Sequence, residues 1–203
     1  MLINAPPEEK LDPRVKRTRR LLEEAFSELI REKDFQSVSI QDIAVRAGIN
    51  RATFYAHFPD KYALLEHQIR QEFRAEIEKR TLNACHFSED NLRALILTVC
   101  EFIGEANSHC KSPRGQFGQL METQIKEQTK GLLMTWLEQI GSNPSPVIAA
   151  TAASWAIYGL AQYWNEQKDH DSLGEYIEKI MPLAEANLQF SRCLLYTSPS
   201  PRH

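Results

Sequence analysis

Apolar residues recur every three or four positions along almost the whole chain, and no segment shows the strict alternation of a half-buried β-strand. The first such row predicts an amphipathic helix over about residues 14–33 and consists of Leu22, Ala25, Phe26, Leu29 and Ile30. The length of 203 residues suffices for a small domain followed by a larger one. The sequence therefore predicts an all-α protein.

Two short helices with a tight turn between them are predicted after the first helix. Ser39 is suited to cap the second helix, and Asp42 three residues later gives a weak capping-box pattern. Gly48 is suited to close it, because glycine adopts the left-handed conformation without a Cβ clash. Asn50 is the expected cap of the third helix, which should end before Pro59. This layout is that of a helix-turn-helix packed on the first helix, so we expect a DNA-binding domain.

The third helix divides its side chains by helical phase. Phe54 and Phe58 lie four residues apart and share one face, which we expect to pack into the core. Hydroxyls, imidazole and ammonium groups donate hydrogen bonds to phosphate oxygens, whereas a guanidinium also forks onto guanine. The other faces carry two further pairs spaced by four: Thr53 with His57, and Arg51 with Tyr55.

The formal net charge is only −3, but positive charge is concentrated in the segment RVKRTRR at 14–20. A solvated first turn of a helix explains such a run equally well. A nucleic-acid surface is the other interpretation, because the field that a phosphate backbone senses is local at physiological ionic strength.

The run IQDIAVRAGINRATFYAHFPDKYALL at 40–65 closely resembles the N-terminal signature of TetR/AcrR-family transcriptional regulators. That family shows an Ile-Ala-x-x-Ala-Gly turn, a Thr-x-Tyr-x-His-Phe recognition helix, then a Lys and a Leu-Leu pair. These motifs stand here at Ile43-Ala44, Ala47-Gly48, Thr53, Tyr55, His57-Phe58, Lys61 and Leu64-Leu65. The match covers about a quarter of the chain, and the rest agrees only in helical character and length.

The resemblance implies a set of DNA contacts. Arg51 and Ala52 stand where the recognition helix meets base edges, in place of an Arg-Gly or Lys-Gly pair frequent in the family. The basic residues Arg14, Lys16 and Arg17 would add backbone contacts. The residues expected to grip operator phosphates are Ser39, Thr53, Tyr55, His57 and Lys61.

The resemblance also implies how the chain is divided. We expect a flexible arm at 1–13, the DNA-binding domain at 14–60, a connecting helix at 61–80, and a helical effector-binding and dimerisation domain at 81–190. The segment 191–203 shifts abruptly to Ser and Pro without a period, which predicts a non-native tail; an ordinary disordered tail is the alternative.

Within 81–190, helices are expected at about 90–106, 147–167 and 172–190, with one or two more over 117–140, broken near 122–131. The last two helices are expected to form a homodimer. A small-residue stripe made of Ala149, Ala153, Ala156 and Leu160 favours close contact with a second subunit. Large contact area typical of interfaces is added by Trp155, Tyr158 and Tyr163, and burial inside its own subunit is the alternative.

A small-molecule pocket is expected between the helices of the larger domain. The residues predicted to wall it are Phe102, Phe117, Met121, Trp136 and Trp164. No metal or other cofactor is predicted, because Cys85-His86 and His109-Cys110 lack the paired spacing of a zinc site.

The sequence contains no phosphate-binding glycine loop, nucleophile elbow or zinc-protease motif, so we do not expect an enzyme. It also lacks an apolar run of membrane-spanning length, which favours a cytoplasmic location. We therefore expect a homodimeric regulator that binds a palindromic double-stranded DNA operator as a repressor and is released by a small effector. The alternatives are an activator or co-regulator of the same fold, and a helical ligand-binding dimer without DNA binding.

Overall fold

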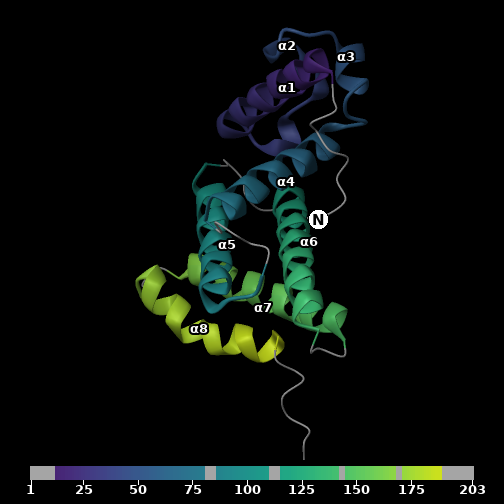
Figure 1. The fold of residues 1–203 in the computed structure, drawn as a ribbon. Coiled ribbons are helices and arrows are strands. Elements are labelled where there is room, and N and C mark those ends of the chain that lie inside the picture. Colours follow the sequence, from purple (N-terminus) through teal and green to yellow (C-terminus); the bar gives the residue numbers. More distant parts are fainter. Residues whose placement is uncertain (1–11, 81–85, 110–114, 142–144, 168–170, 189–203) are drawn as a thin grey trace, which may run out of the picture.

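The computed structural model describes residues 12–80, 86–109, 115–141, 145–167 and 171–188 (Figure 1). Within these residues every regular element is helical, which confirms the all-α expectation. The expected tail at 191–203 and nearly all of the expected arm at 1–13 lie outside the described residues. In chain order the elements are α1 (Pro13–Glu32), a 3-10 turn η2 (Phe35–Ser37), α2 (Ile40–Arg46), α3 (Arg51–Tyr55), α4 (Lys61–Arg80), α5 (Glu89–His109), α6 (Gln116–Ile140), α7 (Pro146–Glu166) and α8 (Leu173–Leu188).

The first three helices form a small domain at one end of the molecule (Figure 1). α1 packs on α2, and α2 packs on α3. Phe26 of α1 is fully buried and meets the Phe35 ring edge-on, with the ring centroids 6.0 Å apart. The apolar face predicted for the first helix therefore does pack against the helix-turn-helix.

α4 leaves this small domain and packs on α5 and α6 of the larger one (Figure 1). Leu65, Ile69, Phe73 and Ile77 recur every fourth residue and are all buried, as their spacing predicts. A single helix thus contributes to both domains, which is the arrangement of a connecting helix.

α6 is one continuous helix of 25 residues, so the break expected near 122–131 is wrong. Polar residues in that stretch suggested a loop. Gln124, Gln128 and Thr129 are instead buried on the helix, whereas Glu122 and Lys126 form an ion pair one turn apart on its surface. The helix ends at Gly141, whose φ of 66° is the left-handed C-terminal conformation.

α7 lies at the centre of the larger domain and packs on α5, α6 and α8. Ala149 and Ala153 are buried within their own subunit, so the stripe predicted to meet a second subunit has the wrong helical phase. Two of the large residues expected to add contact area, Trp155 and Tyr163, are exposed on α7 together with Ile148, whereas Tyr158 is buried. Among the described residues, no helix is long and apolar enough to cross a membrane.

Candidate DNA-binding surface and inter-domain cavity

The turn between α2 and α3 is fixed by backbone hydrogen bonds around Gly48. The Gly48 amide donates to the Val45 carbonyl at 3.1 Å, and the Ile49 amide donates to the Ala44 carbonyl at 3.0 Å. Gly48 has a φ of 67°, which a residue with a Cβ adopts only at a cost. Nothing lies within 4 Å of a Cβ built there, so the backbone conformation rather than lack of space requires glycine.

A full capping box fixes the start of α2, stronger than the weak pattern expected from the sequence. The Asp42 amide donates to Ser39 Oγ at 3.1 Å, and the Ser39 amide donates to Asp42 Oδ2 at 2.9 Å. Lys33 Nζ, just beyond α1, donates to the same carboxylate oxygen at 2.8 Å. These hydrogen bonds lower the pKa of Asp42 well below its ordinary range, and the bond from Lys33 has the largest effect.

Asn50 caps α3 as predicted, since its side chain accepts a hydrogen bond from the Ala52 amide at 2.9 Å. Phe54 and Phe58 are buried, which agrees with the core role predicted for them. α3 ends earlier than expected, at Tyr55. The His57 amide bonds to the Phe54 carbonyl at 2.9 Å in a tight final turn, so His57 and Phe58 lie beyond the helix.

The exposed side of α3 brings together three of the predicted contact residues. Arg51 and Ala52 are exposed, and Tyr55 keeps 49 % of its surface accessible. The Arg51 Nη2 group donates to the Tyr55 hydroxyl at 3.3 Å, and its guanidinium carbon lies 5.9 Å from the Tyr55 ring centroid. These two side chains therefore present one polar edge at the end of the molecule.

Thr53 and His57 are half-buried beside this edge. Burial, and secondly the positive charge of Arg19 on α1, lower the pKa of His57 below its ordinary value. The imidazole is therefore mainly neutral at neutral pH and keeps one N–H for donation.

Lys61 differs from the other predicted phosphate ligands. Its ammonium group donates to three carbonyls, those of Phe35 at 2.9 Å, Gln36 at 3.0 Å and Val38 at 2.8 Å. It also lies 4.6 Å from the centroid of the Phe35 ring. All three N–H donors are thus directed at η2 and the residue that follows it, so the structure assigns Lys61 a positioning role rather than a free phosphate-binding charge.

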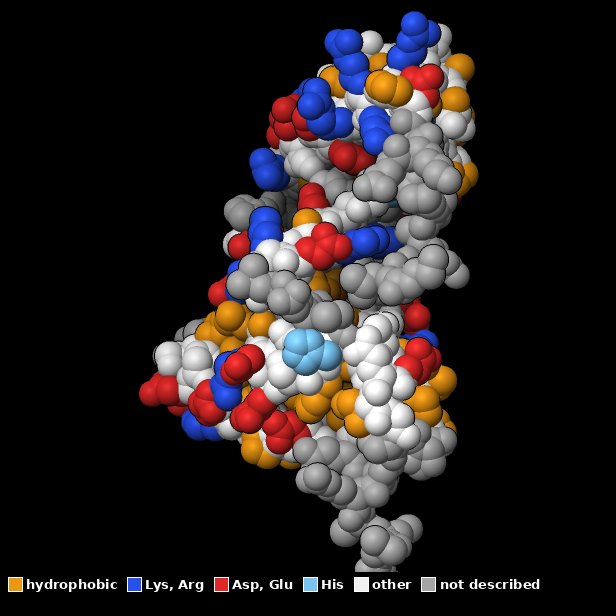
Figure 2. Space-filling model, in the orientation of Figure 1, with side chains coloured by type: hydrophobic (Ala, Val, Ile, Leu, Met, Phe, Trp, Pro, Cys, Tyr) orange, Lys and Arg blue, Asp and Glu red, His pale blue; other side chains and the backbone are white. Residues whose placement is uncertain are grey.

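On the face shown in Figure 2, Lys and Arg side chains gather at this end of the molecule, with Asp and Glu side chains among them. Arg14, Lys16 and Arg17 at the start of α1 are exposed, as a backbone-contacting patch requires. α1 begins at Pro13, with the Arg14 amide bonded to the Asp12 carboxylate at 2.8 Å. The positively charged segment 14–20 is therefore either a solvated first turn of a helix or a DNA-contacting surface, and the two interpretations differ only in whether DNA covers it.

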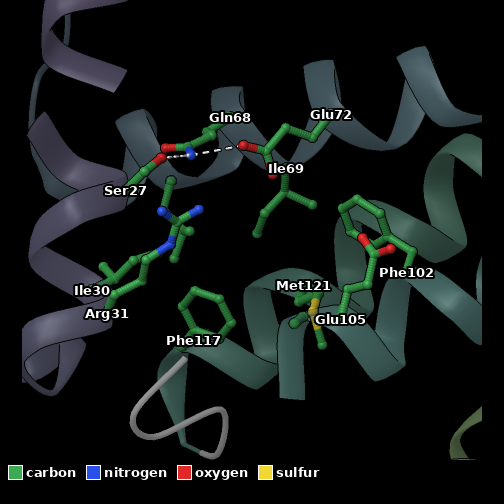
Figure 3. A pocket seen from close by; sticks show the side chains of 12 residues that line it. Ser27, Ile30, Arg31, Gln68, Ile69, Glu72, Phe102, Glu105, Phe117 and Met121 are labelled. Carbon is green, nitrogen blue, oxygen red and sulfur yellow. Dashed lines mark hydrogen bonds between the residues drawn. The ribbon is translucent and has the colours of Figure 1, made fainter. Parts of the chain in front are cut away.

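Three of the predicted pocket residues, Phe102, Phe117 and Met121, line one cavity of about 120 Å³ (Figure 3). It lies between α1, α4, α5 and α6, at the junction of the two domains. Trp136 and Trp164 do not line it. Trp136 is buried with its ring 6.1 Å from that of Phe87, and the Trp164 indole donates to the Asp171 carbonyl at 3.3 Å.

The segment that forms the small domain and the start of α4 matches a known family. Residues 21–67 match the model described as bacterial regulatory proteins, TetR family. A curated relative, the uncharacterised HTH-type transcriptional regulator YxbF of Bacillus subtilis, is 38 % identical over 76 residues.

This N-terminal segment therefore resembles that of TetR-family regulators.

The matched region is 37 % of this chain but only 20 % of YxbF, so the chain spans about a fifth of that relative's length. Solved TetR-family structures match more of it. The regulator SCO0857 of Streptomyces coelicolor covers 92 % of this chain and 98 % of its own, with a TM-score of 0.60 at 16 % identity. The repressor AlkX of Dietzia sp. covers 84 % and 98 %, with a TM-score of 0.54 at 22 % identity. At these identities the likeness shows the fold alone.

One exposed residue of the helix-turn-helix was missed by the sequence analysis. Val45 on α2 is 67 % exposed, although it is a large apolar residue. Its helical phase gave a signal, because it lies outside the row formed by the buried Ile43 and Ala44. An exposed methyl group beside the recognition helix is suited to contact a thymine methyl.

The described residues contain no cluster of three or more metal-ligating side chains. Cys85 and Cys110, which belong to the two Cys-His pairs considered in the sequence, lie outside the described residues. Cys100 is buried, and burial raises the pKa of its thiol to about 12, so it is protonated at neutral pH.

Proposed function

We propose that this chain is a homodimeric TetR-family transcriptional repressor that binds a palindromic operator and is released by a small molecule. The observation that carries the proposal is the exposed edge of α3. Arg51 and Tyr55 are joined by a hydrogen bond on the exposed side of this helix. The Asn50 cap fixes the start of the helix, and the buried Phe54 anchors its opposite face. A pre-ordered pair of this kind loses little side-chain freedom on binding DNA.

Each residue of the edge has a distinct role in the proposal. The Arg51 guanidinium reads guanine in the major groove, and the Ala52 methyl meets thymine. Tyr55, Thr53 and neutral His57 donate to phosphates. The Ser39 hydroxyl donates to Asp42 Oδ2 at 2.7 Å in the free protein, so it reaches a phosphate only by giving up that bond. Lys61 acts indirectly, since its three carbonyl contacts hold η2 beneath α2.

Dimerisation is supported by the exposed face of α7 and α8. Ile148, Trp155, Tyr163 and Leu183 each expose more than half of their surface in the isolated subunit. Large aromatic and aliphatic groups gathered in this way are typical of a protein interface. A dimer presents two copies of the recognition helix to the DNA. If the two helices lie about 34 Å apart, both can enter successive major grooves on one face of the duplex.

Release by an effector is supported by α4 and by the cavity at the domain junction. α4 belongs to both domains, so a change in its angle changes the separation of the two α3 helices. A ligand shifts the protein away from the DNA-competent spacing by no more than its differential affinity for the two states.

Operator binding by the purified full chain tests the proposal. Selection from genomic fragments, followed by footprinting, identifies a site. Fluorescence anisotropy on that site then measures affinity against salt concentration, which should fall linearly on logarithmic axes. Absence of a protected palindrome, or affinity that does not change with salt, contradicts the proposal.

A matched set of variants refines the test. Tyr55→Ala should weaken binding by about tenfold across operator sequences, and Arg51→Ala should relax specificity at one base position. Glu127→Ala changes an exposed carboxylate on α6, away from the proposed contacts, and should leave affinity unchanged. Equal operator affinity for Tyr55→Ala and the unchanged protein would exclude the docking proposed for α3.

A further inference from the structure

The cavity at the domain junction has one apolar side and one polar side (Figure 3). Its apolar side includes Ile69, Phe102, Phe117 and Met121. Its volume of about 120 Å³ is close to that of an engineered cavity of about 150 Å³ that binds benzene. A single ring, or an aliphatic group of similar size, therefore fits.

The polar side includes Arg31, Gln68, Glu72 and Glu105. Gln68 is only 8 % exposed, and its Oε1 atom has no hydrogen-bond partner among the described residues. Its Nε2 atom donates to Glu72 Oε1 at 2.8 Å and also contacts Ser27 Oγ. A buried carbonyl oxygen without a donor costs free energy, so a ligand that donates a hydrogen bond to it is favoured.

Two carboxylates, those of Glu72 and Glu105, and one guanidinium, that of Arg31, are the charged groups that line the cavity. Glu72 and Glu105 are both exposed residues. Partial loss of water around the Glu72 carboxyl group raises its pKa; Glu23 and Glu105 add to the effect, whereas the hydrogen bond from Gln68 and the charge of Arg31 oppose it. Neither Glu72 nor Glu105 has an ion-pair partner in the described part of the chain. A cation placed beside these two carboxylates gains a favourable electrostatic interaction.

An open groove along α1 and α4 continues the cavity outward through Ser27, Arg31, Gln68 and Glu72. The outer groove adds three carboxylates: Glu23, Glu24 and Glu28. Those three already pair with His67, Arg20 and Arg46 respectively. Glu72 and Glu105 are therefore the carboxylates around the cavity and groove that have no ion pair within the described residues.

We propose that this cavity binds a small organic monocation, an ammonium group carried on a ring-sized apolar body. The ammonium group lies against Glu72, Glu105 and Gln68 Oε1. The apolar body lies against Phe102, Phe117 and Met121. This inference rests on the proposed function, because it names the chemical class of the effector.

The same cavity touches parts that position the recognition helix. Phe117 lies 6.2 Å from the Phe35 ring, centroid to centroid, and Phe35 begins η2. Gln116 Oε1 accepts hydrogen bonds from Gln36 Nε2 and from the Tyr62 hydroxyl, each at 2.8 Å. A ligand that moves the start of α6 therefore also moves η2, which precedes α2.

Isothermal titration of the full chain with benzylamine, a cation at pH 7, tests the proposal. Benzyl alcohol serves as the neutral comparator of equal size, and benzoate as the anionic one. We expect saturable binding of benzylamine, binding of benzyl alcohol that is at least about tenfold weaker, and none of benzoate. No benzylamine binding, or equal affinity for the alcohol, overturns the proposal.

Two variants locate the site. Glu72→Gln should weaken benzylamine binding by about tenfold, whereas Glu127→Gln on the outer surface of α6 should not change it. Ala106→Leu fills the cavity from α5 and should abolish binding while circular dichroism and the melting temperature remain those of a folded protein. Unaltered binding in folded Ala106→Leu places benzylamine elsewhere and contradicts the assignment.

Operator affinity, measured with and without saturating benzylamine, separates the two proposals. Loss of all operator binding in the free protein contradicts the proposed function, whatever calorimetry shows. Operator binding that is intact but unaltered by benzylamine contradicts the effector role of the cavity. A change of at least about threefold, absent in Glu72→Gln at the same benzylamine concentration, supports it.

Discussion

The recognition helix α3 and the central helix α7 both expose aromatic residues, but for different reasons. In α3, five residues long, the exposed Tyr55 follows the fully buried Phe54, and a side-chain cap and a glycine turn fix the helix. In α7, 21 residues long, the exposed Trp155 follows the fully buried Ser154. In α3 the more hydrophobic residue of the pair, Phe54, is the buried one. In α7 the small Ser154 is buried and the large Trp155 is exposed.

Close approach of neighbouring helices explains the inverted pattern of α7. α7 packs on α5, α6 and α8, and the buried Ala149, Ala153 and Ala161 let those helices come near. Trp155 lies outside, where Lys126 Nζ sits 4.2 Å from its ring centroid. The difference teaches that small size can outweigh polarity in deciding burial on a helix with three neighbours.

The largest expected effect tests whether α3 depends on its buried ring. Phe54→Ala leaves a cavity beneath α3 and should lower the free energy of unfolding of the small domain by about 3–5 kcal/mol. Tyr55→Ala, one residue along, should change it by less than about 0.5 kcal/mol. Urea unfolding measures both. Equal destabilisation by the two changes would remove the division of α3 into an anchoring and an exposed face.

The next effect concerns Lys61, which supports α3 indirectly. Lys61→Ala removes three hydrogen bonds to backbone carbonyls and should lower stability by about 2 kcal/mol, given the partial exposure of the site. Lys79→Ala, at the other end of α4, removes only an exposed ion pair and serves as the control. If Lys61 were instead a free phosphate ligand, Lys61→Ala would lower operator affinity without lowering stability in thermal unfolding.

On α7, Trp155→Ala should weaken self-association by about tenfold, because large aromatic groups contribute most at interfaces. Folding of the subunit should be little affected, since the side chain is 62 % exposed. Sedimentation equilibrium measures the dimer dissociation constant. Ile140→Ala removes an exposed apolar residue at the end of α6 and should leave association unchanged. An unchanged constant for Trp155→Ala would mean that this face is not the interface.

The smallest effect tests the cap of α2. Ser39→Ala should cost about 1 kcal/mol at pH 7 in urea unfolding. The pKa of Asp42 is lowered on folding, so its contribution is present above its ordinary pKa of 3.8 and is lost as the pH falls below it. The difference between Ser39→Ala and the unchanged protein should therefore shrink at acid pH. A difference that stays constant would show that the carboxylate of the capping box does not take part.

Much of the small domain was predictable because its determinants are neighbours in sequence. Ser39, Gly48 and Asn50 act within three residues of their own positions, and Phe54 and Phe58 show their burial by spacing alone. The continuous course of α6 was not predictable, because Gln124, Gln128 and Thr129 look like loop residues until other helices bury them. Local signals specify where a helix starts and ends more surely than what covers it.

The amino-acid sequence by itself determined the all-α class, the helix-turn-helix and the exposed edge of α3, since each depends on caps and periodicity over a few residues. Tertiary structure alone decided three matters. It directed the Lys61 ammonium to carbonyls of η2 and Val38, 23 to 26 residues away. It buried Ala149 and Ala153 of α7 within their own subunit, and it brought Phe102, Phe117 and Met121 together while leaving Trp136 and Trp164 apart. These depend on contacts between distant segments, and the spacing of residues along one helix carries no information about which segment it will meet.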